Sequence, residues 1–264
     1  MVITISTDSN YIGYTSTLLK SIRHNCPHTK VHLRAIDCSS EDIQILKSSH
    51  DSVIIDIENL NLSVKRRYTR AGSVLSTNIL KKGPNPTYLL SERQCYVSNT
   101  RYRNILHCME VLNEDIVILL DADAIVKKDL TELVDIIKKY DVMCNVGKLV
   151  DRYPNGRCWE CSCIIATNNE KSVNFFNEVK RKTEENMLDW DSDQFAIENT
   201  YSENIYTINL CEDIGNIEDL SWRILTVDNW DVLDFMYDED TYIWPGSGEA
   251  KYTKAYKNEQ SRYN

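Results

Sequence analysis

The sequence predicts an α/β protein, a single domain in which helices flank a mostly parallel central sheet. Strand-like and helix-like patterns alternate over residues 2–57, the order expected of a parallel sheet covered by helices. Five consecutive apolar residues at Ile116–Leu120 are typical of a strand buried on both faces. The 264 residues contain neither an internal repeat nor a linker, and this length can bury one large core.

Local sequence patterns predict the first strands and helices of the chain. They are, in order, a strand at 2–7, a helix at 12–25, a strand at 31–36, a helix at 41–47 and a strand at 53–57. The first helix carries Leu18, Leu19 and Ile22 on one face, and Pro27 follows its end. Residues 58–97 are expected to be irregular because glycines and prolines interrupt them.

The rest of the chain continues the alternation. The expected elements are a helix at 102–112, a strand at 116–120, a helix at 129–140, strands at 142–146 and 162–166, helices at 173–183 and at about 192–199, and a strand at 205–208. Asp129 is a candidate N-cap for the helix that follows it, and Asp191 or Ser192 for the last helix.

The composition is that of an ordinary soluble protein, with 42% hydrophobic and 27% charged residues. No apolar run reaches the roughly 18–20 residues that a membrane span needs. The chain begins with the strand-like Val2–Ile5 rather than a signal peptide, and nine cysteines are an odd number that suits a reducing compartment. We therefore expect a cytoplasmic protein.

The net charge of −10 is unevenly distributed along the sequence. Between Lys65 and Arg103 there are nine basic residues and one acidic residue, Glu92. Such a run forms either a solvated surface or an electropositive rim that attracts an anionic substrate. Both interpretations stay open.

The most informative motif follows the buried strand at 116–120. Asp121, Ala122 and Asp123 form an Asp-x-Asp sequence where the carboxyl end of the strand is expected, and ligands of open α/β sheets bind at that edge. Two carboxylates suit Mg²⁺ or Mn²⁺, which usually complete their shell with substrate phosphates. Aspartates that only form a turn after the strand are the alternative.

The end of the first predicted strand carries a second group of polar residues. Asp8 and Asn10 offer hydrogen bonds to a base or ribose, and Tyr11 offers a stacking face. Thr7 precedes them on the strand. The alternative is that Asp8 or Ser9 caps the following helix.

Further candidates lie elsewhere in the chain. No Gly-x-Gly-x-x-Gly occurs, so Arg103, upstream of Asp121, is the expected phosphate ligand. Asp193 and Gln194 lie at a helix start and are candidates for contact with a polar substrate. A turn containing Gly248 and Lys251 suits a phosphate group, although a plain surface loop is equally compatible.

Three cysteines, Cys158, Cys161 and Cys163, are close enough in sequence to suggest zinc. Only three thiols lie within this cluster. We expect Cys161 and Cys163 to share one face of a strand as buried apolar residues.

With these residues identified, the chain resembles the retaining GT-A glycosyltransferases of family eight, the group that contains glycogenin and the lipopolysaccharide galactosyltransferases. Five segments carry the resemblance, in the family's order: Thr7–Tyr11 with Ser21 and Ile22, Arg101–Arg103, Leu119–Val126 with Asp129, Leu130 and Leu133, Asp193–Gln194, and Gly248–Lys251. The resemblance implies a GT-A fold, a Rossmann-like sheet flanked by helices.

The sequence departs from the family pattern at two places. Pro245 stands where the family has a histidine that is a third metal ligand, so the metal would be held by Asp121, Asp123, diphosphate and water alone. Cys161 and Cys163 replace the asparagine and glycine of a segment that contacts the sugar and acceptor, so the donor sugar does not follow from the resemblance.

The resemblance implies a metal-dependent glycosyltransferase that moves a sugar, with retention, from a UDP-sugar or similar donor to an acceptor hydroxyl. Residues 1–126 would form the nucleotide-sugar-binding half and residues 127–264 the acceptor half. The implied site consists of Mn²⁺ or Mg²⁺ on Asp121 and Asp123, a donor site of Thr7, Asp8, Asn10, Tyr11, Arg103, Asp121, Ala122, Asp123, Gly248 and Lys251, and Asp193 and Gln194 as catalytic residues at the sugar.

Several alternatives remain at this stage. The acceptor is expected to be a glycan, a glycoside or a protein, or a hydroxylated base in DNA bound through the basic segment 65–103. Phosphatases of the haloacid-dehalogenase type also place Asp-x-Asp after an apolar strand, although their motif opens the domain. A non-catalytic nucleotide-sugar binder is the third alternative, since Pro245 removes a metal ligand.

Overall fold

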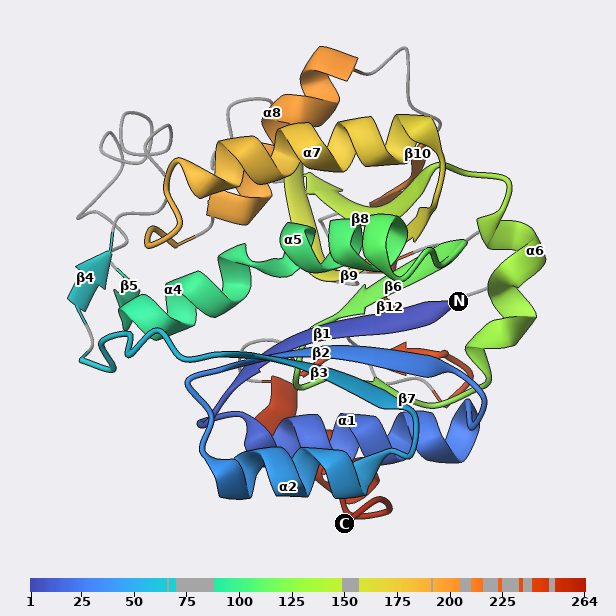
Figure 1. Cartoon of the computed structure of the whole chain (residues 1–264). Helices are drawn as coiled ribbons and strands as arrows, with labels where there is room; N and C mark the ends of the chain where they lie inside the picture. Colours follow the sequence, from blue (N-terminus) through green and yellow to red (C-terminus); the bar gives the residue numbers. More distant parts are fainter. Residues whose placement is uncertain are drawn as a thin grey trace.

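The computed structural model describes residues 1–65, 67–69, 88–148, 157–190, 192–204, 210–215, 223–224, 233–234, 239–246 and 250–264. Its centre is a seven-stranded sheet with helices on both faces (Figure 1), so the predicted α/β class is confirmed. Strands from both halves of the sequence belong to this one sheet.

The strands of the central sheet are all parallel to their neighbours except one. In spatial order they are β10 (Leu210–Gly215), β8 (Val142–Lys148), β9 (Arg157–Thr167), β6 (Ile116–Leu120), β1 (Val2–Asp8), β2 (Lys30–Ile36) and β3 (Val53–Glu58). Only β9 runs antiparallel, to both β6 and β8. β1 and β6 lie side by side and parallel, with Ile5 opposite Leu120, so their carboxyl ends meet at one edge of the sheet.

Two smaller sheets accompany the central one. The first contains β11 (Arg223–Ile224), β12 (Leu233–Asp234), β13 (Ile243–Trp244) and β7 (Ile125–Val126), and the second contains β4 (Arg67–Thr69) and β5 (Tyr88–Leu90). β13 pairs with β7, which follows the Asp-x-Asp motif, and thereby brings the C-terminal part of the chain beside Asp121 and Asp123.

Helices cover both faces of the sheet (Figure 1). One face carries α1 (Ile12–Asn25) and α2 (Ser40–Ser49), and the other carries α5 (Arg101–Leu106) with the π-helix η1 (His107–Val111), α7 (Glu170–Glu184) and α8 (Ser192–Asn204). The remaining helical segments within the described ranges are α4 (Glu92–Asn99), η2 (Leu130–Leu133), α6 (Val134–Ile137), η4 (Ala250–Tyr252) and α9 (Lys254–Gln260).

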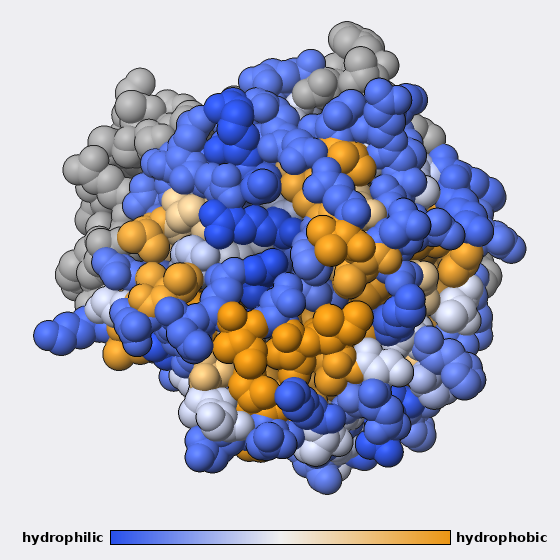
Figure 2. All heavy atoms as spheres, viewed as in Figure 1, coloured by the Kyte–Doolittle hydropathy of each residue, from blue (hydrophilic) through white to orange (hydrophobic). Residues whose placement is uncertain are grey.

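The buried residues form two main clusters, one on each face of the sheet. On β6, Ile116, Ile118 and Leu120 pack with α1 and α2, whereas Val117 and Leu119 pack with α5, α7 and α8. This alternation explains why the strand sequence is apolar throughout. Figure 2 shows that the surface is mostly polar, with an apolar patch over the edge strand β3, where Ile54 and Ile57 are 40% and 50% exposed.

Some expectations need correction. The segment 58–97, expected to be irregular, ends in α4, which begins with a capping box between Ser91 and Gln94. Only Cys95 and Asn99 of α4 are buried. A helix with so small a buried face shows no apolar stripe in its sequence, so apolar periodicity does not predict it. The helix expected at 129–140 is split into η2 and α6, and the strand expected at 205–208 lies outside the described residues.

The cysteines do not form a shared face either. Cys161 packs in the cluster beneath α5 and α7, whereas Cys163 packs in the cluster beneath α1. The pairing of β8 and β9 is irregular between Cys144 and Asn145, and this shift changes the alternation along β9. The side chain of Cys158 lies outside the described part of the chain.

None of the helices in the described ranges is long and apolar enough to cross a membrane.

Candidate active site

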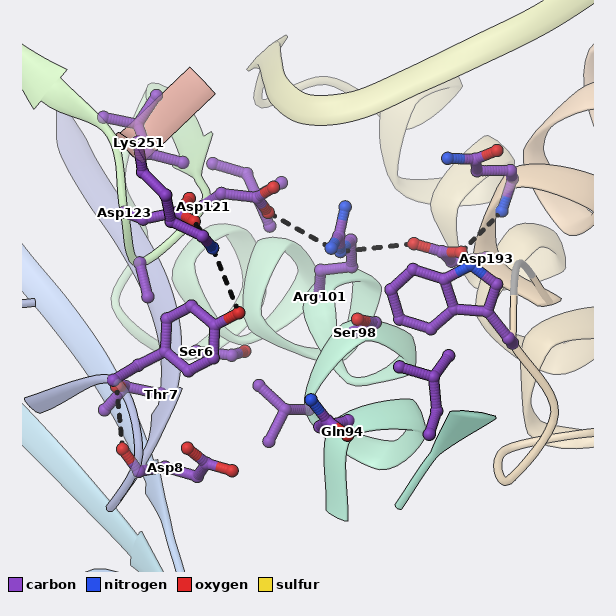
Figure 3. A pocket seen from close by; sticks show the side chains of 18 residues that line it. Ser6, Thr7, Asp8, Gln94, Ser98, Arg101, Asp121, Asp123, Asp193 and Lys251 are labelled. Atoms are coloured by element: carbon purple, nitrogen blue, oxygen red, sulfur yellow. Dashed lines mark hydrogen bonds and ion pairs between the residues drawn. The ribbon is translucent and has the colours of Figure 1, made fainter. Parts of the chain in front are cut away.

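A cavity of about 330 Å³ opens at the carboxyl ends of β1 and β6 (Figure 3). Among its lining residues are most of those predicted from the sequence: Thr7, Asp8, Tyr11, Asp121, Ala122, Asp123, Asp193, Gln194 and Lys251. They come from β1 and the loop after it, the turn after β6, the start of α8 and η4. Residues more than 240 positions apart in sequence therefore meet in one site.

One wall of the cavity contains an ion pair between Lys251 and Asp123. The Lys251 ammonium is 2.7 Å from an Asp123 carboxylate oxygen and 3.3 Å from the Tyr11 hydroxyl (Figure 3). It also lies 4.8 Å from the centre of the Tyr11 ring, a cation–π distance. Burial alone would lower the pKa of Lys251, but the charge and hydrogen bond of Asp123 outweigh it and raise that pKa. Lys251 therefore stays charged in this wall.

The backbone of Asp123 is held from behind by the C-terminal segment. The Tyr256 hydroxyl donates a hydrogen bond of 2.5 Å to the Asp123 carbonyl oxygen. Gly246 packs so closely that a Cβ on this residue would lie 2.3 Å from the same carbonyl oxygen. Glycine is therefore required at position 246 for Asp123, which is only 5% exposed, to keep its place.

The opposite wall is organised around Arg101 of α5 (Figure 3). Its guanidinium lies 3.1 Å from the Asp121 carboxylate and 3.3 Å from the Asp193 carboxylate, and it donates a 2.7 Å hydrogen bond to the Cys161 carbonyl oxygen. Burial would favour the neutral guanidine, but Asp121 and Asp193 outweigh it and raise the pKa of Arg101. This arginine holds two site carboxylates in fixed positions.

Asp193 is buried at the start of α8. Its backbone N–H donates to the Asn99 side chain at 3.1 Å, and its carboxylate accepts the backbone N–H of Gln194 at 2.9 Å. Burial raises the pKa of Asp193, while the charge of Arg101 acts in the opposite direction.

Asp8 ends β1 and lines the cavity. The Asp8 carboxylate accepts hydrogen bonds from the backbone and side chain of Asn10, at 2.9 and 3.4 Å. The N-cap of α1 is Tyr11, and it has no side-chain cap, so neither Asp8 nor Ser9 is the cap. Burial raises the pKa of Asp8, which is only 2% exposed.

The structure does not bring all predicted residues into the cavity. Asn10 contacts Asp8 but is not among the lining residues, and Gly248 lies outside the described residues. Arg103, the predicted phosphate ligand, instead pairs with Glu184 at 2.6 Å and with the Tyr96 hydroxyl. Residues two apart on a helix face in different directions, so Arg101 and Arg103 cannot share one site. Arg103 is therefore not among the residues that line the cavity, whereas Arg101 is.

A polar stripe could have revealed Arg101 in the sequence. Gln94, Ser98 and Arg101 recur at helical spacing along α4 and α5, and all three line the cavity. Once α4 is recognised as a helix, this stripe selects Arg101 rather than Arg103.

The basic segment 65–103 is only partly described. Within the described part, Arg93 pairs with Asp37, and Arg101 and Arg103 pair with the acids named above. These three charges are therefore neutralised locally, and the basic residues at 66, 70, 81 and 82 lie outside the described ranges.

The Asp-x-Asp pair satisfies the chemical requirement for a Mg²⁺ or Mn²⁺ site. Such ions are commonly held by one or two carboxylates together with substrate phosphates and water, and Asp121 and Asp123 both line the cavity. Pro245 supplies no ligand side chain next to them. The donor set fits an ion that depends on the substrate for its remaining ligands.

The comparisons with known proteins agree with this geometry. The sequence model described as Glycosyl transferase family 8 matches residues 2–255. The chain belongs to this family. It is therefore a glycosyltransferase, and membership favours this activity over a phosphatase or a binder without catalysis.

Two solved structures illustrate what the chain is similar to. A crystal structure of the galactosyltransferase LgtC in complex with donor and acceptor sugar analogues matches with a TM-score of 0.56 and 14% identity, covering 99% of this chain and 96% of that one. This similarity shows the GT-A fold. The glycosyltransferase GlyE of Streptococcus pneumoniae matches with a TM-score of 0.45 and 15% identity, over 80% of this chain and 44% of that chain. No curated protein sequence gives a significant match.

Proposed function

We propose that this family 8 enzyme transfers a sugar from a UDP-sugar to an acceptor hydroxyl with retention of configuration, with the donor bound in the cavity at the ends of β1 and β6. The observation that carries the proposal is the convergence of Asp121 and Asp123 with Asp8, Lys251 and Asp193 around one cavity. No single segment of the sequence could form this arrangement alone.

The proposed roles follow from position and chemistry. Asp8 and Tyr11 bind the base and ribose, because a buried carboxylate accepts N–H groups and an aromatic ring stacks on a base. Lys251 exchanges its partner Asp123 for a phosphate oxygen when the donor enters. Residues 1–126 then form the donor half, and residues 127–264 contribute the acceptor side.

Asp121 and Asp123 would hold Mn²⁺ or Mg²⁺ together with the donor diphosphate. Such an ion supplies Lewis-acid stabilisation of the negative charge on the departing diphosphate. Arg101 keeps the Asp121 and Asp193 carboxylates in place, so the site is organised before the substrate arrives.

In the reaction, the bond between the anomeric carbon and the diphosphate oxygen breaks, and its electron pair leaves with the diphosphate. The acceptor oxygen forms the new bond on the same side of the sugar, and its proton passes to the departing diphosphate. Asp193 and Gln194 line the cavity beyond Arg101 and would orient the sugar.

Mass spectrometry of products tests this proposal. The enzyme is incubated with pooled nucleotide sugars, Mn²⁺ and candidate acceptors that include glycosides, proteins and DNA containing hydroxylated bases. We expect one donor to lose its sugar to an acceptor or to water, and Asp123→Ala to abolish this turnover while circular dichroism stays unchanged. Turnover by Asp123→Ala in metal-free buffer would contradict the assignment.

A further inference from the structure

A second cluster of potential ligands lies on the sheet away from the cavity. It contains His32 of β2, Asp56 of β3 and His107 of the π-helix η1, and none of the three lines the donor cavity. Their ligand atoms all lie within 4.8 Å of one another. His32 is fully buried, whereas Asp56 and His107 are partly exposed, so an ion could enter from solvent.

The two imidazole rings are directed at one carboxylate oxygen. The Nε2 atoms of His32 and His107 lie 3.1 and 3.7 Å from the same oxygen of Asp56. In a tetrahedral zinc site with bonds of about 2.0–2.1 Å, neighbouring ligand atoms are roughly 3.3 Å apart. The two observed distances lie on either side of this value. The rings stack with centroids 4.8 Å apart, and the His107 side chain is 26% exposed.

A second interaction fixes the orientation of the His32 ring. Its Nδ1 atom lies 2.9 Å from the Thr4 hydroxyl on the neighbouring strand β1. Histidines that bind metals usually hold their other ring nitrogen in such a hydrogen bond, which selects the tautomer. With a metal on Nε2, the ring proton would lie on Nδ1, which would donate it to the Thr4 hydroxyl.

The charges around the cluster are compatible with a divalent cation. Burial lowers the pKa of His32, which is the direction that favours a neutral imidazole. Burial would raise the pKa of Asp56, but its hydrogen bond to His32 and nearby positive charges outweigh this and lower it. Arg34 approaches Asp56 at 3.8 Å but also pairs with Glu58. The two carboxylates and the guanidinium together carry a net charge of −1.

The backbone at His107 is also unusual. Residues 107–111 form a π-helix directly after α5, and π-helical turns are rare and occur frequently at functional sites. This turn presents His107 toward β2 and β3, where the other two ligands lie.

We propose that His32, Asp56 and His107 bind a divalent transition-metal ion of the zinc type, with water as the fourth ligand. Imidazole ligands favour such ions over Mg²⁺ and Mn²⁺, so this site is chemically distinct from the carboxylate pair at Asp121 and Asp123. A bound ion would connect η1 to the β2–β3 edge of the sheet and stabilise the folded chain.

Isothermal titration with Zn²⁺ tests the proposal, using the full chain stripped by a chelator and kept in excess Mg²⁺ to compete for the carboxylate pair. We expect one Zn²⁺ per chain. His107→Gln should weaken binding at least tenfold, as should Asp56→Asn. His28→Gln, at an exposed histidine outside the cluster, is the matched control and should bind like the wild type.

Thermal unfolding provides a second measurement. Zn²⁺ should raise the unfolding temperature of the wild type and of Asp123→Ala, and have little effect on His107→Gln, whose fold is checked by circular dichroism without metal. Absence of Zn²⁺ binding would overturn the proposal, as would binding that survives His107→Gln and Asp56→Asn. Loss of the Zn²⁺ effect in Asp123→Ala would assign the ion to the donor cavity instead. Neither the Zn²⁺ titration nor thermal unfolding depends on glycosyl transfer. The zinc-site proposal and the proposed function can therefore fail independently.

Discussion

The two walls of the donor cavity differ in how firmly their cations are held. In the Lys251 wall, formed by Tyr11, Asp123 and Lys251, a flexible ammonium pairs with a single carboxylate. In the Arg101 wall, formed by Asp121, Arg101 and Asp193, a planar guanidinium contacts two carboxylates and a backbone carbonyl. Lysine is a compact charge on a mobile stem, whereas arginine is a rigid fork.

This difference separates two functions within one site. The Lys251 ammonium can move from Asp123 to a phosphate by giving up one ion pair and its contacts with Tyr11. Arg101 cannot move without withdrawing its charge from the buried Asp193 and the partly exposed Asp121. We therefore expect changes in the Lys251 wall to alter donor affinity, and changes in the Arg101 wall to alter stability and turnover.

The largest effect is expected from Arg101→Met. Removing one partner of a buried ionic network leaves uncompensated charge and typically costs about 3–5 kcal/mol, so the free energy of unfolding should fall by this amount and turnover should be lost. Urea denaturation measures the first effect. Arg101→Lys keeps the charge but not the fork and should recover only part of the stability. If Arg101→Met is as stable as the wild type, the guanidinium does not hold this wall together.

The pH dependence of the same variant sharpens the comparison. Burial raises the pKa of Asp193 above its ordinary 3.8, and the charge of Arg101 offsets part of this rise. Without Arg101 this pKa rises further. The folded state then keeps a proton that the unfolded state releases, so stability falls as pH rises above about 4. The difference in stability between Arg101→Met and the wild type should therefore grow between about pH 4 and pH 7. If the difference in stability shrinks over this range, the pKa of Asp193 does not rise when Arg101 is removed.

Lys251→Met tests the opposite wall. A hydrogen bond to a charged group contributes about 1.5–3 kcal/mol, so the KM for the nucleotide sugar should rise about tenfold or more, with a smaller change in kcat. Steady-state kinetics over a range of donor concentrations separates the two constants. A loss in kcat with an unchanged KM would place Lys251 in the chemical step rather than in binding.

Gly246→Ala perturbs the support behind Asp123. The added methyl group would lie 2.3 Å from the Asp123 carbonyl oxygen and 2.7 Å from its Cβ, and such crowding typically costs about 1–3 kcal/mol. Both the unfolding temperature and the donor affinity should fall. Gly13→Ala is the matched control, because a Cβ there meets no atom within 4 Å. Equal behaviour of the two variants would mean that the packing behind Asp123 is loose.

The smallest effect is expected from Tyr256→Phe. This change removes only the hydroxyl that donates to the Asp123 carbonyl oxygen, and the loss of one hydrogen bond costs about 1 kcal/mol. Thermal unfolding should detect the difference, and the KM for the donor should change less than in Lys251→Met. A larger change in KM than that of Lys251→Met would reverse the order proposed for this wall.

Local sequence patterns predicted much of the fold. The strands β1, β2, β3 and β6 and the helices α1 and α2 follow from apolar periodicity, and the position of Asp121 and Asp123 follows from the end of β6. These features depend on neighbours in sequence, so the chain alone contains the information.

The features that were missed depend on partners that are distant in sequence. Whether Arg101 or Arg103 faces the cavity depends on which side of α5 is turned toward Asp193 at the start of α8. The helix α4 lacks the apolar stripe that marks a helix. The support of Asp123 by Gly246 and Tyr256 arises from contacts across more than 120 residues. Side-chain spacing carries no signal for this support of Asp123.

We propose that Asp121 and Asp123 clamp a donor diphosphate through a divalent ion. A crystal structure with Mn²⁺ and a non-transferable UDP-sugar analogue tests it most directly, since manganese is located by its anomalous scattering. We predict one manganese ion bonded to both carboxylates and to the diphosphate, with Lys251 turned from Asp123 to a phosphate oxygen. A bound analogue whose diphosphate lies away from Asp121 and Asp123, with no manganese between them, would contradict the account.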